Sequence, residues 1–418
     1  MRIVFTPVGS HGDIHPSIAL ARALNAAPGG HEGIVVTNPY YQRVVEDAGV
    51  RFVALGERME LAEAAQTPGA MSGHFGSFKL LKRLVLPEIP NAAKDFEKIA
   101  RELKPDGVIA HPLALAAPMV CEKLDIRWGG TALAPVSWLN YRDQPVLSPW
   151  QHATPPLLQS KIALWGGGVL MRWVMDGPLN TVRREMGLPK AKDQFITLCK
   201  GGVVNLGLWS PIFRGPLEGD PATGVITGFP WFDVVKEQSG DLERLFKFLD
   251  AGEPPILFSL GTAAVHVSGQ YYSAAAEACR ILKKRGLLLV GKREYAPRTL
   301  PAGVEAFTYA PYSQVFPRCL AIVHHGGIGT TAQSLRAGRP LLITPMAHDQ
   351  FDNAAKVKRL GVGLRVGHAR ATPEKLVQRL THLLGDESFA KNAAAVAPKI
   401  AAEDGVGNAV RAMEKAFL

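Results

Sequence analysis

A strand followed by a glycine-rich turn and a helix occurs near the start of each half of the chain, and this repeated order limits the possible folds most strongly. Arg2–Phe5 is an apolar run, Gly9–Pro16 is rich in turn residues, and helical spacing of apolar residues continues over Ile18–Leu24. A second apolar strand is predicted over Gly33–Thr37. Apolar strands that alternate with helices are typical of a parallel sheet covered on both faces. The N-terminal half is therefore predicted to be α/β.

The same order begins again after residue 255. A strand is predicted over Ile256–Leu260, a helix over Tyr271–Arg285 and a further strand over Leu287–Val290. A buried strand at Ala321–Val323 then runs directly into the glycine-rich turn 324–330, which precedes another helix. Open α/β sheets bind ligands at the carboxyl ends of their strands. Two α/β domains with a ligand cleft between them are therefore predicted.

The length of 418 residues also favours two domains, because one hydrophobic core rarely serves so long a chain. The segment 211–230 holds four prolines and four glycines, a density that helices and central strands do not tolerate. We expect an N-terminal domain over 1–210, a linker over 211–235 and a C-terminal domain over 236–395. A C-terminal helix over 396–418 could pack back on the N-terminal domain.

The basic surplus of the chain gives little information about its partners. Lys and Arg number 47 against 37 Asp and Glu, a net charge of +10, and no basic block or tail accounts for it. Such an even spread is typical of a solvated surface, so no nucleic-acid partner is predicted. An anionic substrate or weak peripheral contact with a negatively charged membrane fits equally well.

The cysteines and the apolar stretches predict a cytoplasmic protein. Four cysteines lie far apart, without a Cys-x-x-Cys pair or a histidine spaced for zinc: Cys121, Cys199, Cys279 and Cys319. The sequence opens on a strand rather than on the apolar core of a signal peptide. The apolar stretches 108–121 and 163–175 are shorter than the ~20 residues of a spanning helix.

The segment Tyr141–Met175 is unusual in holding three tryptophans, Trp150, Trp165 and Trp173, with few charges. Two interpretations remain open. The segment could be a helix pair that completes the core, or it could line a site for an apolar substrate.

The turn after the predicted strand Ala321–Val323 has the features of a phosphate site. Glycines between a buried strand and a helix let backbone N–H groups approach an anion, and the helix dipole adds positive potential there. The glycines are Gly326, Gly327 and Gly329. The Thr330 hydroxyl and the His325 imidazole could donate further hydrogen bonds.

Three familiar kinds of phosphate site do not match. There is no Gly-x-x-x-x-Gly-Lys-Ser/Thr run, and Gly9-x-x-Gly12 has the wrong spacing for a dinucleotide fingerprint. There is also no Asp-x-Asp pair of the kind that a metal-bridged site favours. A metal-free site made of helix dipole and neutral donors is therefore predicted.

Several motifs in register resemble the donor-binding signature of the UDP-glycosyltransferase superfamily, which has the GT-B fold of two Rossmann-like domains. They are Tyr309-Ala310-Pro311, His325-x-Gly327-x-Gly329-Thr330, Gly338-x-Pro340 and Asp349-Gln350. The resemblance extends to Gly9-x-x-Gly12-Asp13-x-x-Pro16 and to Thr227-Gly228-Phe229-Pro230. In detail the chain is most similar to bacterial rhamnosyltransferases of the rhamnolipid type and to antibiotic glycosyltransferases.

The resemblance implies a role for each matching residue. Tyr309, beside Ala310, would stack on the pyrimidine base of the donor nucleotide. Thr262 and His325 would contact the diphosphate, which Gly329 and Thr330 would cap. Asp349 and Gln350 would bind sugar hydroxyls, as a carboxylate beside an amide can.

One position departs from the family pattern. Many plant and animal members have a glutamate that binds the ribose hydroxyls eight residues after the histidine, whereas this chain has Gln333. A neutral amide binds a diol less strongly than a carboxylate does. The donor could therefore be a dTDP-sugar, whose deoxyribose lacks the 2′-hydroxyl, and a UDP-sugar is not excluded.

The resemblance also implies an inverting transfer, which needs one general base for the acceptor hydroxyl. Asp13, in the loop after the first strand, corresponds to the base, although an Asp there could instead cap the helix. His11 and His15 flank it, and either could be the base or orient it.

The implied activity is metal-independent, inverting transfer of rhamnose or glucose from a dTDP- or UDP-sugar to a hydroxyl of an apolar acceptor. The segments Gln66–Leu86 and Tyr141–Met175 are expected to shape the acceptor pocket. Two alternatives remain: a sugar-nucleotide epimerase or hydrolase of the same fold, and an inactive partner protein.

Overall fold

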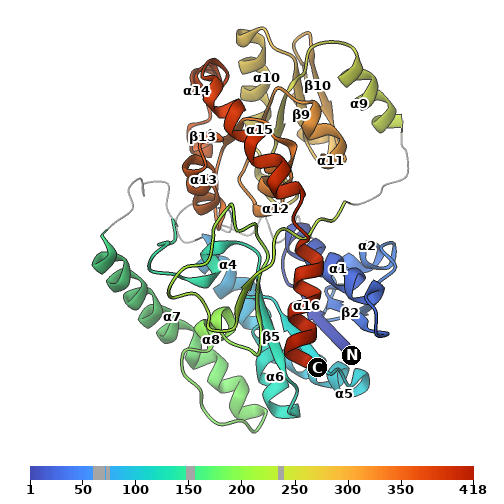
Figure 1. Cartoon of the computed structure of the whole chain (residues 1–418), viewed down its shortest axis with the longest axis vertical. Coiled ribbons are helices and arrows are strands. Elements are labelled where there is room, and N and C mark those ends of the chain that lie inside the picture. The colour runs from blue at the N-terminus through green and yellow to red at the C-terminus, as the bar shows by residue number, and fades with distance from the viewer. Residues whose placement is uncertain (60–70, 72–75, 147–155, 234–239) are drawn as a thin grey trace.

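The computed structural model describes residues 1–59, 71, 76–146, 156–233 and 240–418, and two parallel sheets organise them into two domains (Figure 1). The sheet of the N-terminal domain has the order β3 (Arg51–Ala54), β2 (Glu32–Thr37), β1 (Arg2–Thr6), β4 (Gly107–Ala110), β5 (Trp128–Ala132), β6 (Asn205–Gly207), β7 (Gly224–Ile226). The sheet of the C-terminal domain has the order β10 (Val304–Phe307), β9 (Gly286–Leu289), β8 (Ile256–Ser259), β11 (Ala321–His324), β12 (Leu341–Ile343), β13 (Gly363–Arg365). The predicted α/β class with two parallel sheets is confirmed.

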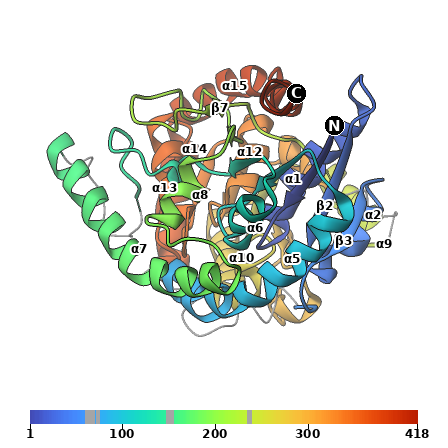
Figure 2. The same cartoon turned by 90° about the horizontal axis from the view of Figure 1, so that it is seen from below.

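Helices cover both sheets (Figures 1 and 2). In the first half of the chain they are α1 (His11–Ala26), α2 (Gln42–Glu46), α4 (Gly76–Leu80), α5 (Ile89–Leu103), α6 (Ala116–Leu124), α7 (Leu157–Glu185) and α8 (Gln194–Lys200). In the second half they are α9 (Gly240–Asp250), α10 (Tyr271–Leu282), α11 (Tyr312–Val315), α12 (Ile328–Ala337), α13 (Gln350–Arg359), α14 (Pro373–Gly385), α15 (Glu387–Ala401) and α16 (Gly405–Phe417).

The strand order reverses direction once in each sheet, and these points locate the site. After β1 the chain builds outward through β2 and β3, and it then returns to place β4 on the other side of β1. The C-terminal domain repeats this arrangement with β8 and β11. The loops that leave two such strands diverge to opposite faces of the sheet and leave a crevice at the carboxyl ends of the strands.

The predicted linker needs a correction, because it contains a strand of the N-terminal sheet. β7 pairs in parallel with β6, so the N-terminal sheet extends to Ile226. Its three residues lie at the sheet edge, where short strands flanked by proline and glycine are tolerated. β6 begins only at Asn205, because Gly202 has a left-handed backbone (φ +87°) that turns the chain before the strand.

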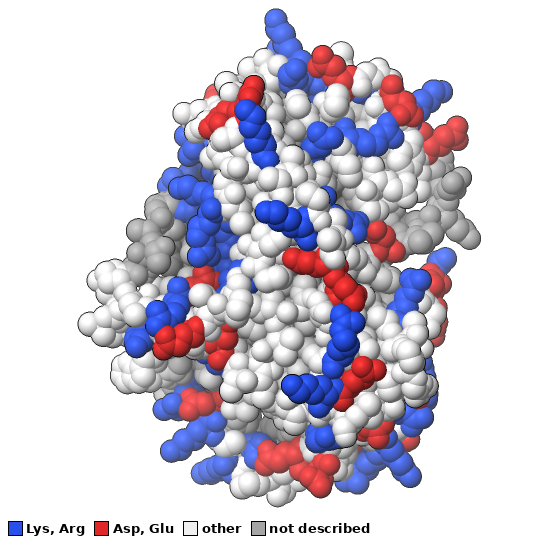
Figure 3. All heavy atoms as spheres, in the orientation of Figure 1, with Lys and Arg blue, Asp and Glu red and all other residues white. Residues whose placement is uncertain are grey.

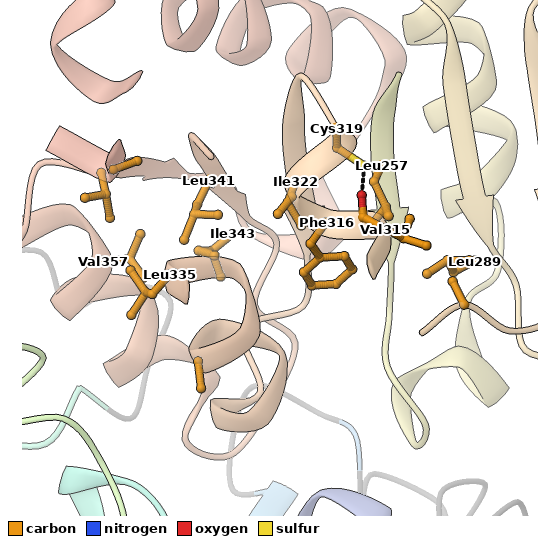
Figure 4. Packing of buried hydrophobic residues seen from close by; sticks show 14 of the residues in the cluster. Leu257, Leu289, Val315, Phe316, Cys319, Ile322, Leu335, Leu341, Ile343 and Val357 are labelled. Carbon is orange, nitrogen blue, oxygen red and sulfur yellow. Dashed lines mark hydrogen bonds between the residues drawn. The ribbon is translucent and has the colours of Figure 1, made fainter. Parts of the chain in front are cut away.

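The C-terminal domain is built on an apolar layer between its sheet and helices (Figure 4). Leu257, Ile322 and Leu341 come from three neighbouring strands and pack with Phe316. Cys319 belongs to this layer, where its Sγ donates to the Val315 carbonyl at 3.3 Å. All four cysteines are buried and free, and burial raises the pKa of each thiol to about 12. They act as small apolar core residues.

The last helix, α16, returns to the N-terminal domain and lies beside α1 (Figure 1). Its buried face adds Val410, Met413 and Phe417 to the core that contains Phe5 of β1. A Cβ atom on Gly107 would overlap the Phe417 ring, so the close contact depends on a glycine there. The polypeptide therefore crosses between the domains twice.

Two tryptophans of the segment Tyr141–Met175 face solvent instead of completing a core. Trp165 is 72% exposed and Trp173 is 82% exposed, and both lie on α7, a helix at the edge of the molecule (Figure 2). Trp150 and most of residues 66–75 lie outside the described residues. In the described part of the chain, no helix combines the length and the apolar character that crossing a membrane requires.

Acidic and basic side chains are interspersed over the face that Figure 3 shows. Exposed ion pairs of the protein include Arg280 with Glu277 and Lys391 with Glu387. Pairs of this kind contribute little to stability. On this face the distribution fits the expectation that the surplus of positive charge is spread over the surface.

A buried ion network joins the two domains. Lys356 of α13 is 1% exposed, and its Nζ lies 2.5 Å from Asp352 Oδ2 and 2.9 Å from Asp143 Oδ2. Asp143 belongs to the N-terminal domain and also pairs with Arg359 at 2.8 Å. The backbone N–H of Val146 donates to Asp352 Oδ1 at 3.2 Å. The network therefore fixes α13 to residues 143–146.

We predict that Lys356→Met lowers the free energy of unfolding by about 3–5 kcal/mol, because it leaves the buried Asp352 and Asp143 carboxylates without their shared cation. Chemical denaturation of the two proteins at neutral pH would measure the difference. Lys391→Met is the matched control, since it breaks an exposed pair on α15 and should change stability little. Equal stability losses in the two variants would contradict the prediction.

Candidate active site

Asp13 lies in the first turn of α1, just beyond the carboxyl end of β1. Its Oδ2 accepts hydrogen bonds from the Ser10 backbone N–H at 2.6 Å and from Ser10 Oγ at 2.9 Å. Ser10 is the N-cap of the helix and Asp13 is the third helical residue, so the two form a capping box. The expectation that Asp13 itself could be the cap is therefore wrong.

His111, which follows β4, faces the other carboxylate oxygen of Asp13. Leu113 N–H donates to His111 Nδ1 at 3.2 Å, which places the ring hydrogen on Nε2. That atom lies 3.6 Å from Asp13 Oδ1. Burial by itself would raise the pKa of Asp13, but the interactions with His111 and Ser10 outweigh it and lower that pKa below 3.8. Asp13 is a carboxylate at neutral pH.

Gly9 allows this arrangement of Asp13. Its backbone has φ +135°, a value that side chains disfavour, and a Cβ atom there would overlap the Asp13 carboxylate. The Tyr41 hydroxyl donates to the Gly9 carbonyl at 2.6 Å. The loop is thus held in the one conformation that brings the carboxylate against its backbone.

His11 and His15 lie on α1 beside Asp13. Their ring centroids are 5.2 Å apart, and His11 also contacts the Tyr41 ring edge-on at 5.1 Å. His15 packs at 5.0 Å from Phe232, which follows the N-terminal sheet. Burial, together with His11, lowers the pKa of His15 to about 3, so the ring is neutral at pH 7. Its Nε2 has no hydrogen-bond partner among the described residues.

His325 lies at the carboxyl end of β11 in the C-terminal domain, over two glycines. A Cβ atom on Gly261 (φ +68°) or on Gly327 would overlap the imidazole ring. The ring therefore lies between the loop after β8 and the N-terminus of α12. Burial lowers the pKa of His325 to about 4, so the ring is neutral at pH 7, and its buried Nδ1 has no partner among the described residues.

The N-terminus of α12 has the geometry of an anion site. Its N-cap is Gly327, which supplies no side-chain hydrogen bond to the first amides of the helix. Gly329 is exposed, and a Cβ atom on it would meet nothing within 4 Å. Thr330 is buried and bonds the Tyr312 hydroxyl, which lies 3.1 Å from Ser259 Oγ. The helix end, the glycine turn and the His325 ring therefore lie next to one another.

Tyr309 and Ala310 occupy the turn after β10. Ala310 is buried in the core, and Tyr309 is half-buried. Burial raises the pKa of Tyr309 to about 12, and the charge of Asp233 adds to this effect. Thr262, in the loop after β8, is exposed. These positions border the same end of the sheet as His325.

Gln333 on α12 forms a hydrogen bond with Asp233, which lies in the segment that leads out of the N-terminal domain. Its Nε2 donates to Asp233 Oδ1 at 3.2 Å, and its buried Oε1 has no partner among the described residues. Arg336 lies 3.6 Å from Asp233 and 4.4 Å from the centre of the Trp231 ring. A carboxylate therefore stands beside the amide that replaces the family glutamate.

Asp349 and Gln350 begin α13 and differ in their surroundings. Asp349 Oδ2 accepts from Asn353 Nδ2 at 2.7 Å, and Asp349 makes no side-chain cap. Gln350 is buried, and its Oε1 accepts from the backbone N–H groups of Met346 and Ala347 at 2.8 and 3.1 Å. Gln350 thus fixes the preceding turn through its side chain. Of the two residues, Asp349 is the one whose side chain can gain or lose a proton.

Asp13 and Asp349 come from different domains and interact electrostatically. Burial raises the pKa of Asp349 to about 7, and the Asp13 charge adds to the rise although the Asn353 hydrogen bond opposes it. Asp13 also favours the charged form of His348, whose pKa burial nevertheless lowers. The two domains therefore bring a carboxylate with a low pKa near a carboxyl with a raised one.

The described residues contain no group of three His, Cys, Asp or Glu side chains placed to hold a metal ion. The charged groups of the candidate site include Asp13, Asp349 and the Asp233–Arg336 pair beside Gln333.

Comparisons with known proteins agree with this architecture. The family of erythromycin biosynthesis protein CIII-like C-terminal domains matches residues 289–415. O-mycaminosyltylonolide 6-deoxyallosyltransferase of Streptomyces fradiae is 29% identical over 439 residues, covering 99% of this chain and 97% of its own. The chain is similar to members of the UDP-glycosyltransferase superfamily. It is a glycosyltransferase of GT-B fold.

Other glycosyltransferases match over almost the full chain. A sterol 3-beta-glucosyltransferase of Arabidopsis thaliana is 26% identical, covering 99% of this chain and 65% of its own length. The solved structure of the spinosyn rhamnosyltransferase SpnG, complexed with thymidine diphosphate, superposes with a TM-score of 0.71 at 18% identity. It covers 99% of this glycosyltransferase and all of that chain.

Sequence reasoning missed three residues of the candidate site: His111, Tyr312 and Asp233. His111 directly follows the apolar residues 108–110, which form most of β4. The carboxyl ends of neighbouring parallel strands meet, so its position could have been found. Tyr312 follows the Tyr309-Ala310-Pro311 motif. Asp233 and Gln333 are 100 residues apart in the sequence, and no sequence pattern predicts their contact.

We predict that Asp349 makes the stability of this glycosyltransferase depend on pH. Because its folded pKa is raised from 3.8 to about 7, the folded protein holds this proton more tightly than the unfolded chain does. The resulting stability is complete below pH 3.8 and is lost as the pH rises through 7. Asp349→Asn should remove this dependence, so the difference in thermal midpoint between wild type and variant should change across that window.

A second variant checks the coupling between the domains. Asp13→Asn removes a negative charge that raises the pKa of Asp349. The pH range over which stability is lost should therefore lie lower in Asp13→Asn than in the wild type. If the thermal midpoints of the wild type and Asp349→Asn differ by the same amount at every pH from 4 to 8, Asp349 has an ordinary pKa and the prediction is wrong.

Proposed function

We propose that this glycosyltransferase moves a hexose from a dTDP- or UDP-sugar to a hydroxyl of an apolar acceptor, with inversion and without a metal ion. The observation that carries the proposal is the pairing of Asp13 from one domain with the Asp349 and α12 region of the other. A base and an anion site on opposite domains suit a reaction between an acceptor and a sugar nucleotide.

The reaction would be a single displacement. The acceptor oxygen attacks the anomeric carbon as the bond from that carbon to the diphosphate breaks, and Asp13 takes the acceptor proton. His111 and Ser10 occupy three sites on the Asp13 carboxylate and fix its orientation. Asp13 has a lowered pKa, so it is in its basic form throughout the neutral range.

The leaving diphosphate would be held by neutral donors. The first amides of α12 and the helix dipole attract the developing charge. His325 is uncharged at pH 7 and would donate one hydrogen bond from a buried ring. Thr330 lies on the first turn of the same helix, and Thr262 lies in the facing loop. Neutral donors of this kind stabilise the diphosphate without a cation.

The nucleoside would bind between Tyr309 and α12. The Tyr309 ring would stack on the pyrimidine, and Asp349 would bind hydroxyls of the sugar. The side-chain amide of Gln333 already donates a hydrogen bond to Asp233. We expect it to bind the 2′-hydroxyl of a ribose only weakly, which favours dTDP as the donor nucleotide. The spinosyn rhamnosyltransferase structure with thymidine diphosphate supports this choice.

The acceptor would be an apolar molecule with a free hydroxyl. The relatives named for a tylonolide derivative and for sterols support this class. The first of them is named for transfer of a 6-deoxyhexose, which supports a deoxyhexose such as rhamnose. Four free, buried cysteines fit a reducing cytoplasm as the place of the reaction.

We predict that Asp13→Asn lowers kcat at least ~100-fold while the Kd for the sugar nucleotide stays nearly unchanged, because an amide cannot accept the acceptor proton. Steady-state kinetics and calorimetry measure the two quantities. Asp47→Asn is the matched control, since its carboxylate is exposed on the same domain and pairs with Arg43 in a surface contact. If kcat stays near normal in Asp13→Asn but falls in His15→Asn, His15 rather than Asp13 is the base.

A donor-by-acceptor panel tests the proposed activity as a whole. dTDP-rhamnose, UDP-glucose and UDP-glucuronate are each incubated with a flavonoid, a macrolide, a hydroxy-fatty acid, a sterol or no acceptor. We expect a glycosylated product with a dTDP- or UDP-hexose and an apolar acceptor, and inversion of the anomeric configuration by NMR. Sugar release or isomerisation without any acceptor would instead indicate a hydrolase or an epimerase.

A further inference from the structure

The first half of α7 presents a stripe of large apolar side chains to solvent. The stripe consists of Leu158, Ile162, Trp165, Val169 and Trp173, and all five are exposed. They recur at steps of three and four residues, so they share one face of the helix. At 1.5 Å per residue the stripe is about 22 Å long. We call it the α7 stripe.

Most of the buried residues of α7 lie beyond the stripe, in the second half of the helix. Met175, Leu179 and Val182 belong to the core of the N-terminal domain, and Asp176 accepts hydrogen bonds from the backbone N–H groups of Asp193 and Gln194. Figures 1 and 2 both show α7 along the outer edge of the molecule. Exposed single apolar residues are ordinary, whereas a continuous row with two tryptophans marks an interaction surface.

The charges around the stripe are mostly basic. Residues 157–175 contain no Asp or Glu, and their charged residues, Lys161 and Arg172, fall on the same border of the stripe at helical spacing. Arg172 is paired with Asp193 at 2.7 Å, so part of its charge is offset. The loop that packs on the second half of α7, through two hydrogen bonds between Asn180 and Ala191, adds the exposed Lys190 and Lys192. The stripe is therefore apolar with a basic border.

We propose that the α7 stripe docks on the surface of a membrane that contains anionic phospholipids, with the helix lying in the plane of the interface. Tryptophan favours the boundary between headgroups and acyl chains. Lysine and arginine extend to the headgroups while their neighbours enter the apolar layer. Each basic residue near such a surface adds attraction, and the net charge of +10 acts in the same direction.

The arrangement fits a lipid surface better than a second copy of this chain. Two copies joined through the stripe would bring their basic borders close together, and residues 157–175, which hold the stripe, contain no acidic group to offset them. Three consecutive glycines, Gly166–Gly168, interrupt the helix surface, and a Cβ atom on any of them would meet nothing. A fluid bilayer adapts to such a gap, whereas a protein interface needs a matching partner surface.

The test uses the full chain and vesicles of phosphatidylcholine with or without phosphatidylglycerol. We expect the protein to float with the vesicles that contain phosphatidylglycerol, more weakly as salt increases. Brominated lipid should quench tryptophan fluorescence on binding. The double variant Trp165→Ser/Trp173→Ser should bind at least ~10-fold more weakly. Lys161→Glu should bind several-fold more weakly to the anionic vesicles.

The control is Ile281→Ser, which replaces an exposed aliphatic residue on α10 of the other domain. It should bind the vesicles as the wild type does, and all variants should keep the wild-type thermal midpoint because the replaced side chains are exposed. Three results would overturn the proposal: no binding to anionic vesicles, equal binding by the double tryptophan variant, or a wild-type dimer in light scattering that this variant dissociates.

Discussion

The shared cation of Lys356 is the interaction on which the arrangement of the two domains rests. A buried ammonium between two buried carboxylates is stable only while all three remain in place. One carboxylate, Asp143, belongs to the N-terminal domain, and Lys356 belongs to α13, whose first turn follows Asp349. The same network that joins the domains therefore fixes the distance between Asp349 and the loop that carries Asp13. The proposed reaction needs that distance to be set before either substrate binds.

Each domain places its polar group against a glycine in the loop after a central strand. In the N-terminal domain the glycine is Gly9 and the group is the Asp13 carboxylate; in the C-terminal domain they are Gly261 and the His325 ring. A side chain at either glycine would displace the group beside it. The two halves thus use one device for different chemistry: one holds a charged base and the other a neutral donor, and burial and hydrogen bonding set the difference in protonation.

The sequence was sufficient to predict features that depend on local pattern. The order of strands and helices, the glycine turn of residues 324–330 and the position of Asp13 after β1 all follow from spacing and residue type. Contacts between distant segments could not be predicted in this way. The pairing of Asp13 with His111, the bond from Gln333 to Asp233 and the network at Lys356 depend on how separate elements meet. The exposure of Trp165 and Trp173 also needed the structure, because the helical period shows which residues share a face and not whether a partner covers it.

The return of α16 to the N-terminal domain has a consequence for how the chain matures. β1 is synthesised long before α16, yet the layer that covers it includes Val410, Met413 and Phe417 of that helix. Until these residues leave the ribosome, Phe5 and its neighbours lack part of their cover, and the first domain stays exposed to chaperones and proteases while the second one is made. The two domains therefore mature together, and neither is an independent module for recombination with a related enzyme unless the crossing helix is exchanged with it.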